Sequence, residues 1–306
     1  MNTENEFKKR HSESHFYKYA RASTARHILK EGKFLAQSPL KFNDPFDVQI
    51  GMHLDFDPSN MHNLLHEKLI SIVESKNEPV FEQRTPFSEF AVKLRKAAKD
   101  GPLLNEKIKE ETKPLYDTLG EKLRQDRVNY IENRMKFIKR MRTLCFTTTP
   151  DNMLMWSHYA KDHTGVVIKL KVAENESDDD PLWLAEKVVY TKKAAPLIPK
   201  DTMVDLTFGL IKTPPKHSGR ELGLIKYDVW EYENEFRLWD VVNETNVDPY
   251  TIQIHPKRFE AVYFGVKTDE KEAEEIRNLA LELNKDMKIF RAKKHESEFK
   301  IVFDQI

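Results

Sequence analysis

Polar and apolar residues alternate from Trp230 to Trp239, where the sequence reads WEYENEFRLW. Because successive side chains of a strand point to opposite faces, this alternation predicts a strand with one aromatic and one acidic face. The aromatic face carries Trp230, Tyr232, Phe236 and Leu238, and the acidic face carries Glu231, Glu233, Glu235 and Arg237. Two interpretations fit. One is a solvent-facing edge strand protected by its charges; the other is a catalytic carboxylate pair, Glu233 and Glu235, on a rigid strand.

The segments before residue 57 and after residue 141 also favour strands. Short alternating or apolar runs predict them over 15–20, 34–36, 143–147, 165–172, 184–191, 261–264, 288–291 and 299–303. Ser23 and Gly32 are typical of the start and end of a helix, and a second helix is predicted over 268–284. These elements together predict an α+β fold with mixed or antiparallel sheets.

Residues 57–141 change to helical spacing. Their apolar stripes and helix-start signals predict helices that begin at Asp57-Pro58 and at Thr85-Pro86, a third over 103–125 that bends at Pro114, and a last one ending near Met141. We therefore predict a single α+β domain over 15–306 with a helical insertion over about 57–141. Residues 1–14 are polar and charged, and we expect them to form a disordered tail.

A loop containing two prolines follows the second predicted strand. In residues 38–47, SPLKFNDPFD, the polar residues Asn43, Asp44 and Asp47 are framed by two phenylalanines. Asp44 and Asp47 fit the role of turn caps, as Asp residues often do. A stiffened polar loop between aromatic rings is also how a binding site is preorganised. The sequence leaves both interpretations open.

His158 and Tyr159 stand in the segment MWSHYA over 155–160. The next histidine, His163, is five residues away, whereas helical metal sites place two histidines three or four residues apart and add an acidic ligand. We therefore predict no metal here. His158 and Tyr159 are expected to form hydrogen bonds or to contact a substrate, and a structural role for His158 is the alternative.

Composition narrows the class of protein. The 306 residues contain 50 Lys plus Arg and 50 Asp plus Glu, so the net charge indicates neither a nucleic-acid nor a membrane partner. A local basic excess over 122–142 fits either a phosphate-binding surface or a solvated helix face. The nine glycines are scattered singly, which excludes a P-loop or a Rossmann fingerprint. Cys145 lies in an apolar run, so its side chain is expected to be buried in the core and not to act as a nucleophile. A single cysteine and the lack of a membrane-length apolar run predict a cytoplasmic protein.

Four segments together carry a resemblance to a known family. They are Tyr17-Lys18-Tyr19, KFNDPFD over 41–47, MWSHYA over 155–160 with Gly165-Val166, and Trp230 with YENEFR over 232–237. In order and approximate spacing they resemble the bacterial family named domain of unknown function 2971. That family has no settled activity.

The layout is also similar to the ADP-ribosyltransferase superfamily, particularly its DarT-like and RNA 2′-phosphotransferase-like branches. The resemblance implies twisted mixed sheets, with Glu235 as the late catalytic glutamate and Tyr159 as the middle residue. The pair Glu233 and Glu235 is similar to the Glu-x-Glu pair of arginine-modifying transferases. Lys18 stands near the position of that superfamily's first-strand histidine. By the same resemblance, the residues that contact NAD are Lys18, Tyr19, Asn43, Asp44, Trp156, His158 and Arg237.

This resemblance implies an enzyme that transfers ADP-ribose from NAD to a nucleic acid or protein acceptor, in the role of a toxin or phage-defence effector. Cleavage of the nicotinamide–ribose bond passes through an oxocarbenium-like state, which a fixed carboxylate such as Glu235 stabilises. Tyr19, Trp156 and Tyr159 are candidates to stack on nicotinamide. Arg237 is expected either to neutralise the glutamates or to contact a phosphate.

Two other classes of function fit the same residues. A metal-dependent nuclease or phosphodiesterase would use Asp44, Asp47, Glu233, Glu235 and His158, since hard cations take carboxylate oxygens. A non-catalytic binding module, such as an antitoxin or a sensor, would use the glutamate row as a docking surface.

Overall fold

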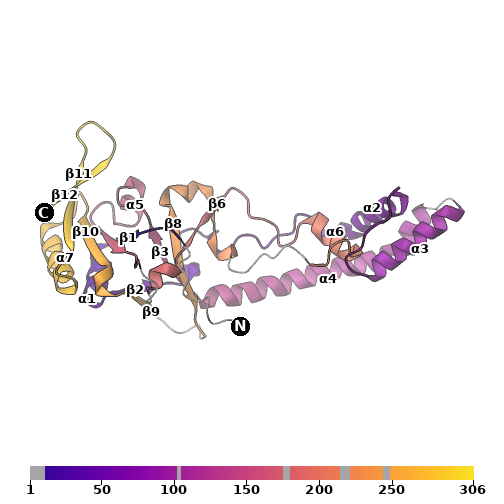
Figure 1. Ribbon diagram of the computed structural model, residues 1–306, viewed down its shortest axis with the longest axis horizontal. Coiled ribbons are helices and arrows are strands. Elements are labelled where there is room, and N and C mark those ends of the chain that lie inside the picture. Colours follow the sequence, from indigo (N-terminus) through magenta and orange to yellow (C-terminus); the bar gives the residue numbers. More distant parts are fainter. Residues whose placement is uncertain (1–10, 102–104, 175–179, 214–220, 244–248) are drawn as a thin grey trace. The chain divides into compact units, whose positions relative to one another are not determined.

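The largest element of the fold is an eight-stranded sheet with the strand order β12-β11-β10-β4-β1-β3-β8-β5. It is seen in a computed structural model that describes residues 11–101, 105–174, 180–213, 221–243 and 249–306 (Figure 1). The strands are β1 (His15–Ala20), β3 (Met141–Thr147), β4 (Val166–Lys171), β5 (Glu186–Lys187), β8 (Glu235–Val241), β10 (Phe259–Phe264), β11 (Lys288–Lys294) and β12 (Ile301–Gln305). Within the described part of this sheet, β10 and β11 pair in parallel and the other neighbours are antiparallel. The predicted α+β class with a mixed sheet is therefore confirmed.

Two small sheets accompany the large one. β2 (Lys33–Ala36) pairs antiparallel with β9 (Tyr250–Gln253), and β6 (Val189–Thr191) pairs in parallel with β7 (Ile225–Tyr227). The single strand predicted over 184–191 is wrong, because the segment begins with a short 3-10 helix, Pro181–Leu184, and then divides into β5 and β6. β7 leads directly into η7, the 3-10 helix Asp228–Glu233.

The sheet unit, comprising residues 1–48, 137–192 and 224–306, has cores on both faces of the large sheet. Alternation along β1 separates them: Phe16 belongs to one core and Tyr19 to the other. Helices α1 (Ala22–Glu31) and α7 (Glu270–Leu283) pack together and cover the Phe16 face. The short helix α5 (Met153–His158) contributes Met155 and Trp156 to the opposite core.

The ends of α1 test two cap predictions. Gly32 ends the helix in the left-handed conformation, with φ 66°, as predicted. The predicted start at Ser23 is wrong: the helix begins at Ala22, and Arg21 in an extended conformation precedes it without a side-chain cap. Burial of Ala25, Ile28 and Leu29 stabilises the helix without that cap. Residues 1–10 of the predicted tail lie outside the described residues.

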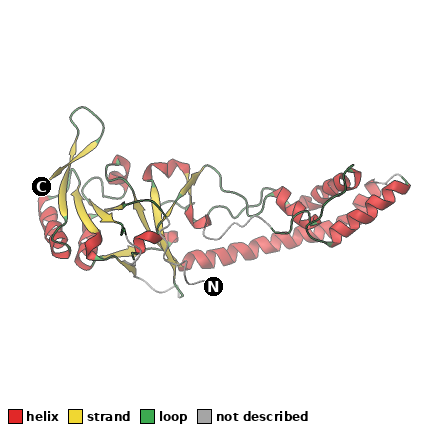
Figure 2. Ribbon diagram, in the orientation of Figure 1, coloured by secondary structure: helices red, strands yellow, loops and turns green. Residues whose placement is uncertain are grey.

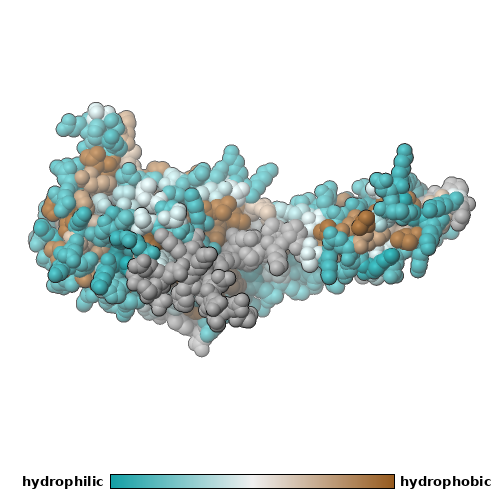
Figure 3. Space-filling view, in the orientation of Figure 1, coloured by the Kyte–Doolittle hydropathy of each residue, from teal (hydrophilic) through white to brown (hydrophobic). Residues whose placement is uncertain are grey.

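The helical unit comprises residues 49–136 and 193–223. It contains α2 (Met61–Glu74), α3 (Pro86–Asp100), α6 (Lys200–Phe208) and α4 (Asn105–Arg140) up to residue 136 (Figure 2). Both predicted helix starts are confirmed: Asp57 caps the 3-10 turn η3 (Pro58–Asn60) that leads into α2, and Thr85 forms a capping box with Ser88 at α3. On the face shown in Figure 3, hydrophilic side chains cover most of this unit, whose buried core includes Leu65, Leu69 and Phe208.

Helix α4 corrects the prediction of two separate helices over 103–141. It is one helix of 36 residues, with Pro114 inside it. No glycine or proline stands between residues 121 and 140, so nothing ends the helix near the predicted boundary at 125. Pro114 removes one backbone donor without ending the helix, because the flanking residues are mostly strong helix formers such as Glu, Lys, Leu and Arg. Among the described residues, no helix combines the length and the apolar character needed to cross a membrane.

Candidate functional site

The acidic segment is not one continuous strand. Its first half forms η7, Asn234 follows in the left-handed conformation with φ 42°, and β8 begins only at Glu235. The predicted ten-residue strand is therefore wrong up to Asn234. Asparagine tolerates this backbone region better than most residues do, because its short polar side chain finds local partners; here it donates to Thr148 Oγ1. The break removes Glu231, which is exposed, from the row of acidic side chains.

The second half of the segment is buried. β8 lies between β3 and β5 in the large sheet. Glu235 is 4% exposed and Arg237 is fully buried. The interpretation of a solvent-facing edge strand is therefore wrong. Buried charges need partners, so the side chains around these two residues decide what the site does.

Arg237 binds two carboxylates. Its Nη1 and Nη2 donate to Asp47 Oδ1 and Oδ2 at 2.8 and 2.6 Å, a bidentate pair. Its Nε donates to Glu235 Oε1 at 2.8 Å. The proline-containing loop thus meets β8 through Asp47. No feature of the sequence indicates this pairing, because the two residues are 190 positions apart.

A buried lysine joins Glu233 to Glu235. Lys226 Nζ lies 2.5 Å from Glu233 Oε2 and 2.8 Å from Glu235 Oε2, and 3.8 Å from Asp47 Oδ2. Its side chain is 5% exposed. We refer to the five residues Asp47, Lys226, Glu233, Glu235 and Arg237 as the ion cluster. With every member ionised, it holds two positive and three negative charges.

The pKa values within the ion cluster move in opposite directions. Burial acts to raise the pKa of Glu235, but Arg237 and Lys226 outweigh it and hold that pKa well below its ordinary value. Burial raises the pKa of Glu233 and of Asp47, in each case against the effect of a neighbouring cation. Burial, with a smaller effect of the neighbouring Glu235 carboxylate, therefore makes Glu233 and Asp47 the members of the cluster that take up a proton most readily.

Aromatic side chains lie at the Glu233 end of the cluster. Tyr159, at the end of α5, donates its hydroxyl to Glu233 Oε1 at 2.6 Å. His158 Nδ1 lies 3.1 Å from Tyr232 Oη, and its ring lies 6.3 Å from those of Tyr159, Trp230 and Tyr232. His158 is exposed and the other three are half-buried. We refer to His158, Tyr159, Trp230 and Tyr232 as the aromatic group. It forms a surface over a buried, net negative cluster.

Most of this site lies in one matched segment of the sequence. Residues 155–238 match the family described as protein of unknown function (DUF2971). The family resemblance drawn from the sequence is confirmed over these residues. No curated protein and no solved structure matches the chain.

The DUF2971 segment contains the whole aromatic group and four of the five cluster residues, Asp47 being the exception. It also contains Tyr190, whose hydroxyl accepts a hydrogen bond from the Glu235 backbone N–H at 2.8 Å. Lys226 and Tyr190 are site residues that the sequence reasoning missed. The signal for Lys226 was weak: one lysine in the run Leu224-Ile225-Lys226-Tyr227, just before the acidic segment.

Two aromatic candidates are core residues. Trp156, in the DUF2971 segment, is fully buried and donates its indole N–H to Pro150 O at 2.7 Å. Tyr19 is 5% exposed, packs edge-on against Trp156 with 5.4 Å between ring centroids, and donates to Thr149 O at 3.1 Å. These contacts hold the segment 149–150, which leads into α5, and so help to position His158 and Tyr159. Both rings are buried and expose no face to a ligand.

The remaining candidates lie at or near the cluster. Lys18 Nζ donates to the Cys145 backbone carbonyl at 2.8 Å. Asn43 is exposed. Asp44 accepts from Phe46 N at 2.9 Å, as a turn cap does, and is buried. The loop therefore combines both interpretations: Asp44 caps a turn, whereas Asp47 belongs to the site.

Backbone strain occurs where the loop ends. Val48, directly after Asp47, is buried and has φ 62°. A positive φ is rare for a β-branched residue and costs about 1–3 kcal/mol. Such strain persists only where surrounding contacts fix the backbone, and here the bidentate pair of Asp47 with Arg237 supplies them.

The acidic side chains are not arranged as a metal site. Among the described residues, no group of three His, Cys, Asp or Glu side chains is placed to hold a metal ion. Within the cluster, Lys226 and Arg237 occupy the positions next to the carboxylate oxygens. The positive charge that balances these carboxylates therefore comes from the side chains of Lys226 and Arg237.

Proposed function

We propose that the ion cluster and the aromatic group form the active centre of an ADP-ribosyltransferase-like enzyme. It would transfer ADP-ribose from NAD to a nucleic acid or protein acceptor, on a sheet of the ADP-ribosyltransferase type. One observation carries the proposal: three separate segments, which carry Asp47, Tyr159 and the pair Glu233 and Glu235, meet through Lys226 and Arg237 in one bonded network. A role as toxin or phage-defence effector rests on the resemblance in sequence alone.

The aromatic group suits the nicotinamide end of NAD. That ring is planar and carries a positive charge until its bond to ribose breaks. Aromatic faces attract cations, and the surplus negative charge of the ion cluster adds to that attraction. Trp230 already has one cation near its face, since Lys226 Nζ lies 5.3 Å from its ring centroid. His158, Tyr159, Trp230 and Tyr232 are the residues that would hold the nicotinamide.

Glu233 is the best-placed carboxylate for the reaction. The C–N bond between ribose and nicotinamide breaks, and its electron pair leaves with neutral nicotinamide. An oxygen or nitrogen of the acceptor forms the new bond to ribose, and its proton passes to Glu233. Burial raises the pKa of Glu233, against the effect of Lys226, which makes its carboxylate a stronger base than an exposed glutamate. Its negative charge also stabilises the positive charge that develops on ribose.

Glu235 has a different role in this proposal. Both of its carboxylate oxygens are bonded to a cation, Lys226 or Arg237. Glu233 has only one oxygen on a cation, Lys226, and its other oxygen accepts from the hydroxyl of Tyr159. Glu235 therefore acts as a positioning residue that holds the two cations beneath Glu233. The late glutamate of the resemblance and the reacting carboxylate are then two different residues, Glu235 and Glu233.

The alternatives have less support. A docking surface made of the glutamate row needs exposed carboxylates, yet Glu233 and Glu235 are 3% and 4% exposed. A nuclease that binds metal through Asp47, Glu233 and Glu235 would first have to displace Lys226 and Arg237 from them. For both reasons the transferase is the better-supported function.

The experiment is to incubate the protein with NAD and with RNA, DNA or protein acceptors, and to measure released nicotinamide and transferred ADP-ribose. Glu233→Gln keeps the shape of the side chain and removes its charge, so turnover should fall by about 10²–10³-fold. Glu231→Gln is the matched control, because Glu231 is exposed and outside the cluster. Its turnover should equal that of the unchanged protein. Absence of NAD turnover with every acceptor, or equal rates in Glu233→Gln and the unchanged protein, would refute the proposal.

A further inference from the structure

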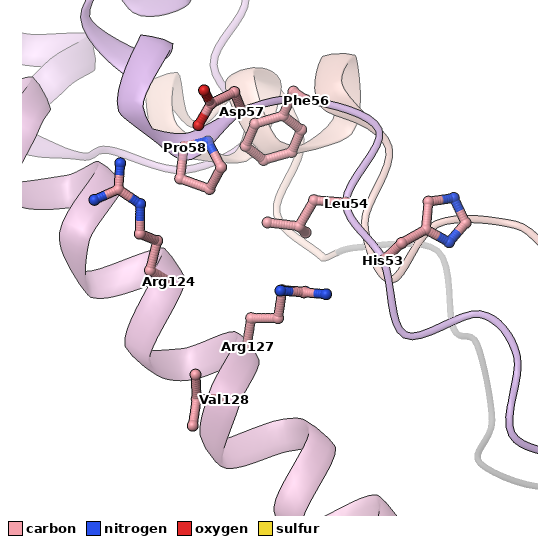
Figure 4. A pocket seen from close by; sticks show the side chains of 8 residues that line it. All are labelled: His53, Leu54, Phe56, Asp57, Pro58, Arg124, Arg127 and Val128. Atoms are coloured by element: carbon pink, nitrogen blue, oxygen red, sulfur yellow. The ribbon is translucent and has the colours of Figure 1, made fainter.

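The helical unit contains a cavity of about 470 Å³ between the segment 53–58 and helix α4 (Figure 4). Cavities of this size are typical of small-molecule sites. The residues that line it are His53, Leu54, Phe56, Asp57, Pro58, Arg124, Arg127 and Val128. Nothing in the reaction proposed for the sheet unit involves them.

The walls of the cavity are fixed by backbone contacts. At one end α4 approaches η3 so closely that a Cβ at Gly120 would lie 2.2 Å from Pro58 O. At the other end Arg127 Nε donates to Met52 O at 3.1 Å. The backbone N–H groups of Leu197 and Lys200 bind His53 O and Asp55 Oδ1 at 2.9 Å each. The segment 53–58 is therefore held in place on both sides.

Two arginines supply positive charge to one wall. Arg124 and Arg127 are three residues apart on α4 and so share a helix face. Arg124 pairs with Glu121 at 2.7 Å and lies near Asp57. Among the described residues, no carboxylate lies within ion-pair distance of Arg127, and its Nη atoms have no hydrogen-bond acceptor. Arg127 extends from α4 toward His53 (Figure 4).

The other wall, formed by the segment 53–58, presents apolar side chains beside His53 and Asp57. Leu54 lies between Arg127 and the ring of Phe56, and Pro58 faces Arg124 (Figure 4). Phe56 is half-buried and packs at the edge of the core of the helical unit. A ligand that fits both walls has an anionic group that accepts from a guanidinium fork and a flat ring that packs on Leu54 and Phe56.

We propose that this cavity binds a nucleotide, with its phosphate on Arg127 and Arg124 and its base against Leu54 and Phe56. A phosphate offers oxygens in the geometry that arginine binds best, and a nucleobase is the planar group that most commonly accompanies it. A free nucleotide and one unit of a nucleic-acid strand have the same chemistry here, so the experiment includes both.

The test measures binding of four probes to the full-length protein by calorimetry: thymidine 5′-monophosphate, thymidine, inorganic phosphate and single-stranded oligothymidylate. Thymidine compounds lack the adenine of NAD, which separates this site from the proposed active centre. The monophosphate or the oligonucleotide should bind, thymidine should bind at least about tenfold more weakly than the monophosphate, and Arg127→Ala should weaken binding about tenfold or more. Binding of the monophosphate would identify a site for free nucleotides. Binding of the oligonucleotide without binding of the monophosphate would identify a nucleic-acid site.

Three controls make the result specific. Lys122→Ala removes an exposed charge from α4 two residues before Arg124, off the shared face, and should leave binding unchanged. Arg124→Gln keeps the hydrogen bond from Arg127 to Met52 O, which anchors the chain next to the segment 53–58. Reduced binding in that variant would therefore come from the lost guanidinium and not from movement of the segment. Glu233→Gln should bind normally even if it has lost NAD turnover. The proposal is wrong if neither nucleotide probe binds, if Arg127→Ala and Arg124→Gln both bind normally, or if Lys122→Ala weakens binding as much as they do.

Discussion

Tyr159 donates a hydrogen bond of 2.6 Å to Glu233 across 74 residues of sequence. This bond joins the partly exposed aromatic group to the buried ion cluster. It also contributes to the pKa of Glu233, which burial raises and which the bonds from Lys226 and Tyr159 lower. The contact therefore couples the surface of the site to the protonation of its carboxylate.

The first prediction concerns Tyr159→Phe. The change removes one donor from a buried carboxylate, which should cost about 1–3 kcal/mol of unfolding free energy and raise the pKa of Glu233 further. In urea titrations the midpoint should fall. In the proposed reaction the rise of rate with pH should move to higher pH, because the carboxylate ionises later. Tyr227→Phe is the control, since Tyr227 is 49% exposed. An unchanged midpoint in Tyr159→Phe would show that the bond does not stabilise the fold.

The second prediction concerns Lys226→Met. Without Lys226, Arg237 is the one cation left in the cluster to balance the carboxylates of Glu233, Glu235 and Asp47. Removal of one partner of a buried ion pair costs about 3–5 kcal/mol, because the other charge stays buried without compensation. The free energy of unfolding at pH 7 should fall by that amount. Lys187→Met should change it little, because Lys187 is exposed on β5, which pairs with β8. The double change Lys226→Met with Glu233→Gln should recover part of the loss, because it also removes one unpaired negative charge. Equal stability of Lys226→Met and the unchanged protein would contradict this account.

The third prediction is a stability maximum in mildly acidic solution. The pKa of Glu235 is lowered from 4.5, so below that pH the unfolded chain binds more protons and stability falls as the pH falls. The pKa of Glu233 is raised from 4.5, chiefly by burial, so above that pH the folded chain binds more protons and stability falls as the pH rises. Asp47 acts in the same direction as Glu233.

Unfolding free energies between pH 3 and pH 8 would measure this maximum. Glu233→Gln should flatten the decline on the neutral side, and Glu235→Gln should flatten the decline on the acid side. If Glu233→Gln leaves the neutral side unchanged, its carboxyl does not take up a proton on folding.

Local patterns were sufficient to predict much of the fold. The strand His15–Ala20, the helix starts at Asp57 and Thr85, and the end of α1 at Gly32 depend on residues close together in sequence. The boundary predicted between two helices near residue 125 was wrong, because residues 121–140 contain no glycine or proline that would end a helix there. The end of the acidic row at Asn234 was missed because asparagine adopts either extended or left-handed backbone, and contacts far along the chain select one of them.

The composition of the site was harder to predict. Its acidic residues and Tyr159 stand in motifs that the sequence shows. Lys226 does not, because a buried lysine has the same local sequence signal as an exposed one, and only the fold shows its pairing with Glu233 and Glu235. Trp156 shows the opposite effect: an aromatic residue beside His158 suggests a ligand surface, yet the ring is fully buried.

The last prediction tests the close approach that forms one end of the cavity in the helical unit. Alanine is a better helix former than glycine by about 1 kcal/mol, so Gly120→Ala in the interior of α4 would stabilise an isolated helix. In this protein the added Cβ would lie 2.2 Å from Pro58 O, a backbone atom that cannot move without displacing η3. We therefore expect Gly120→Ala to lower the melting temperature and to weaken nucleotide binding at the cavity. Gly101→Ala is the matched control, because no atom lies within 4 Å of a Cβ added there. If Gly120→Ala melts at or above the temperature of Gly101→Ala, then α4 and η3 are not in close contact and the cavity has no fixed end.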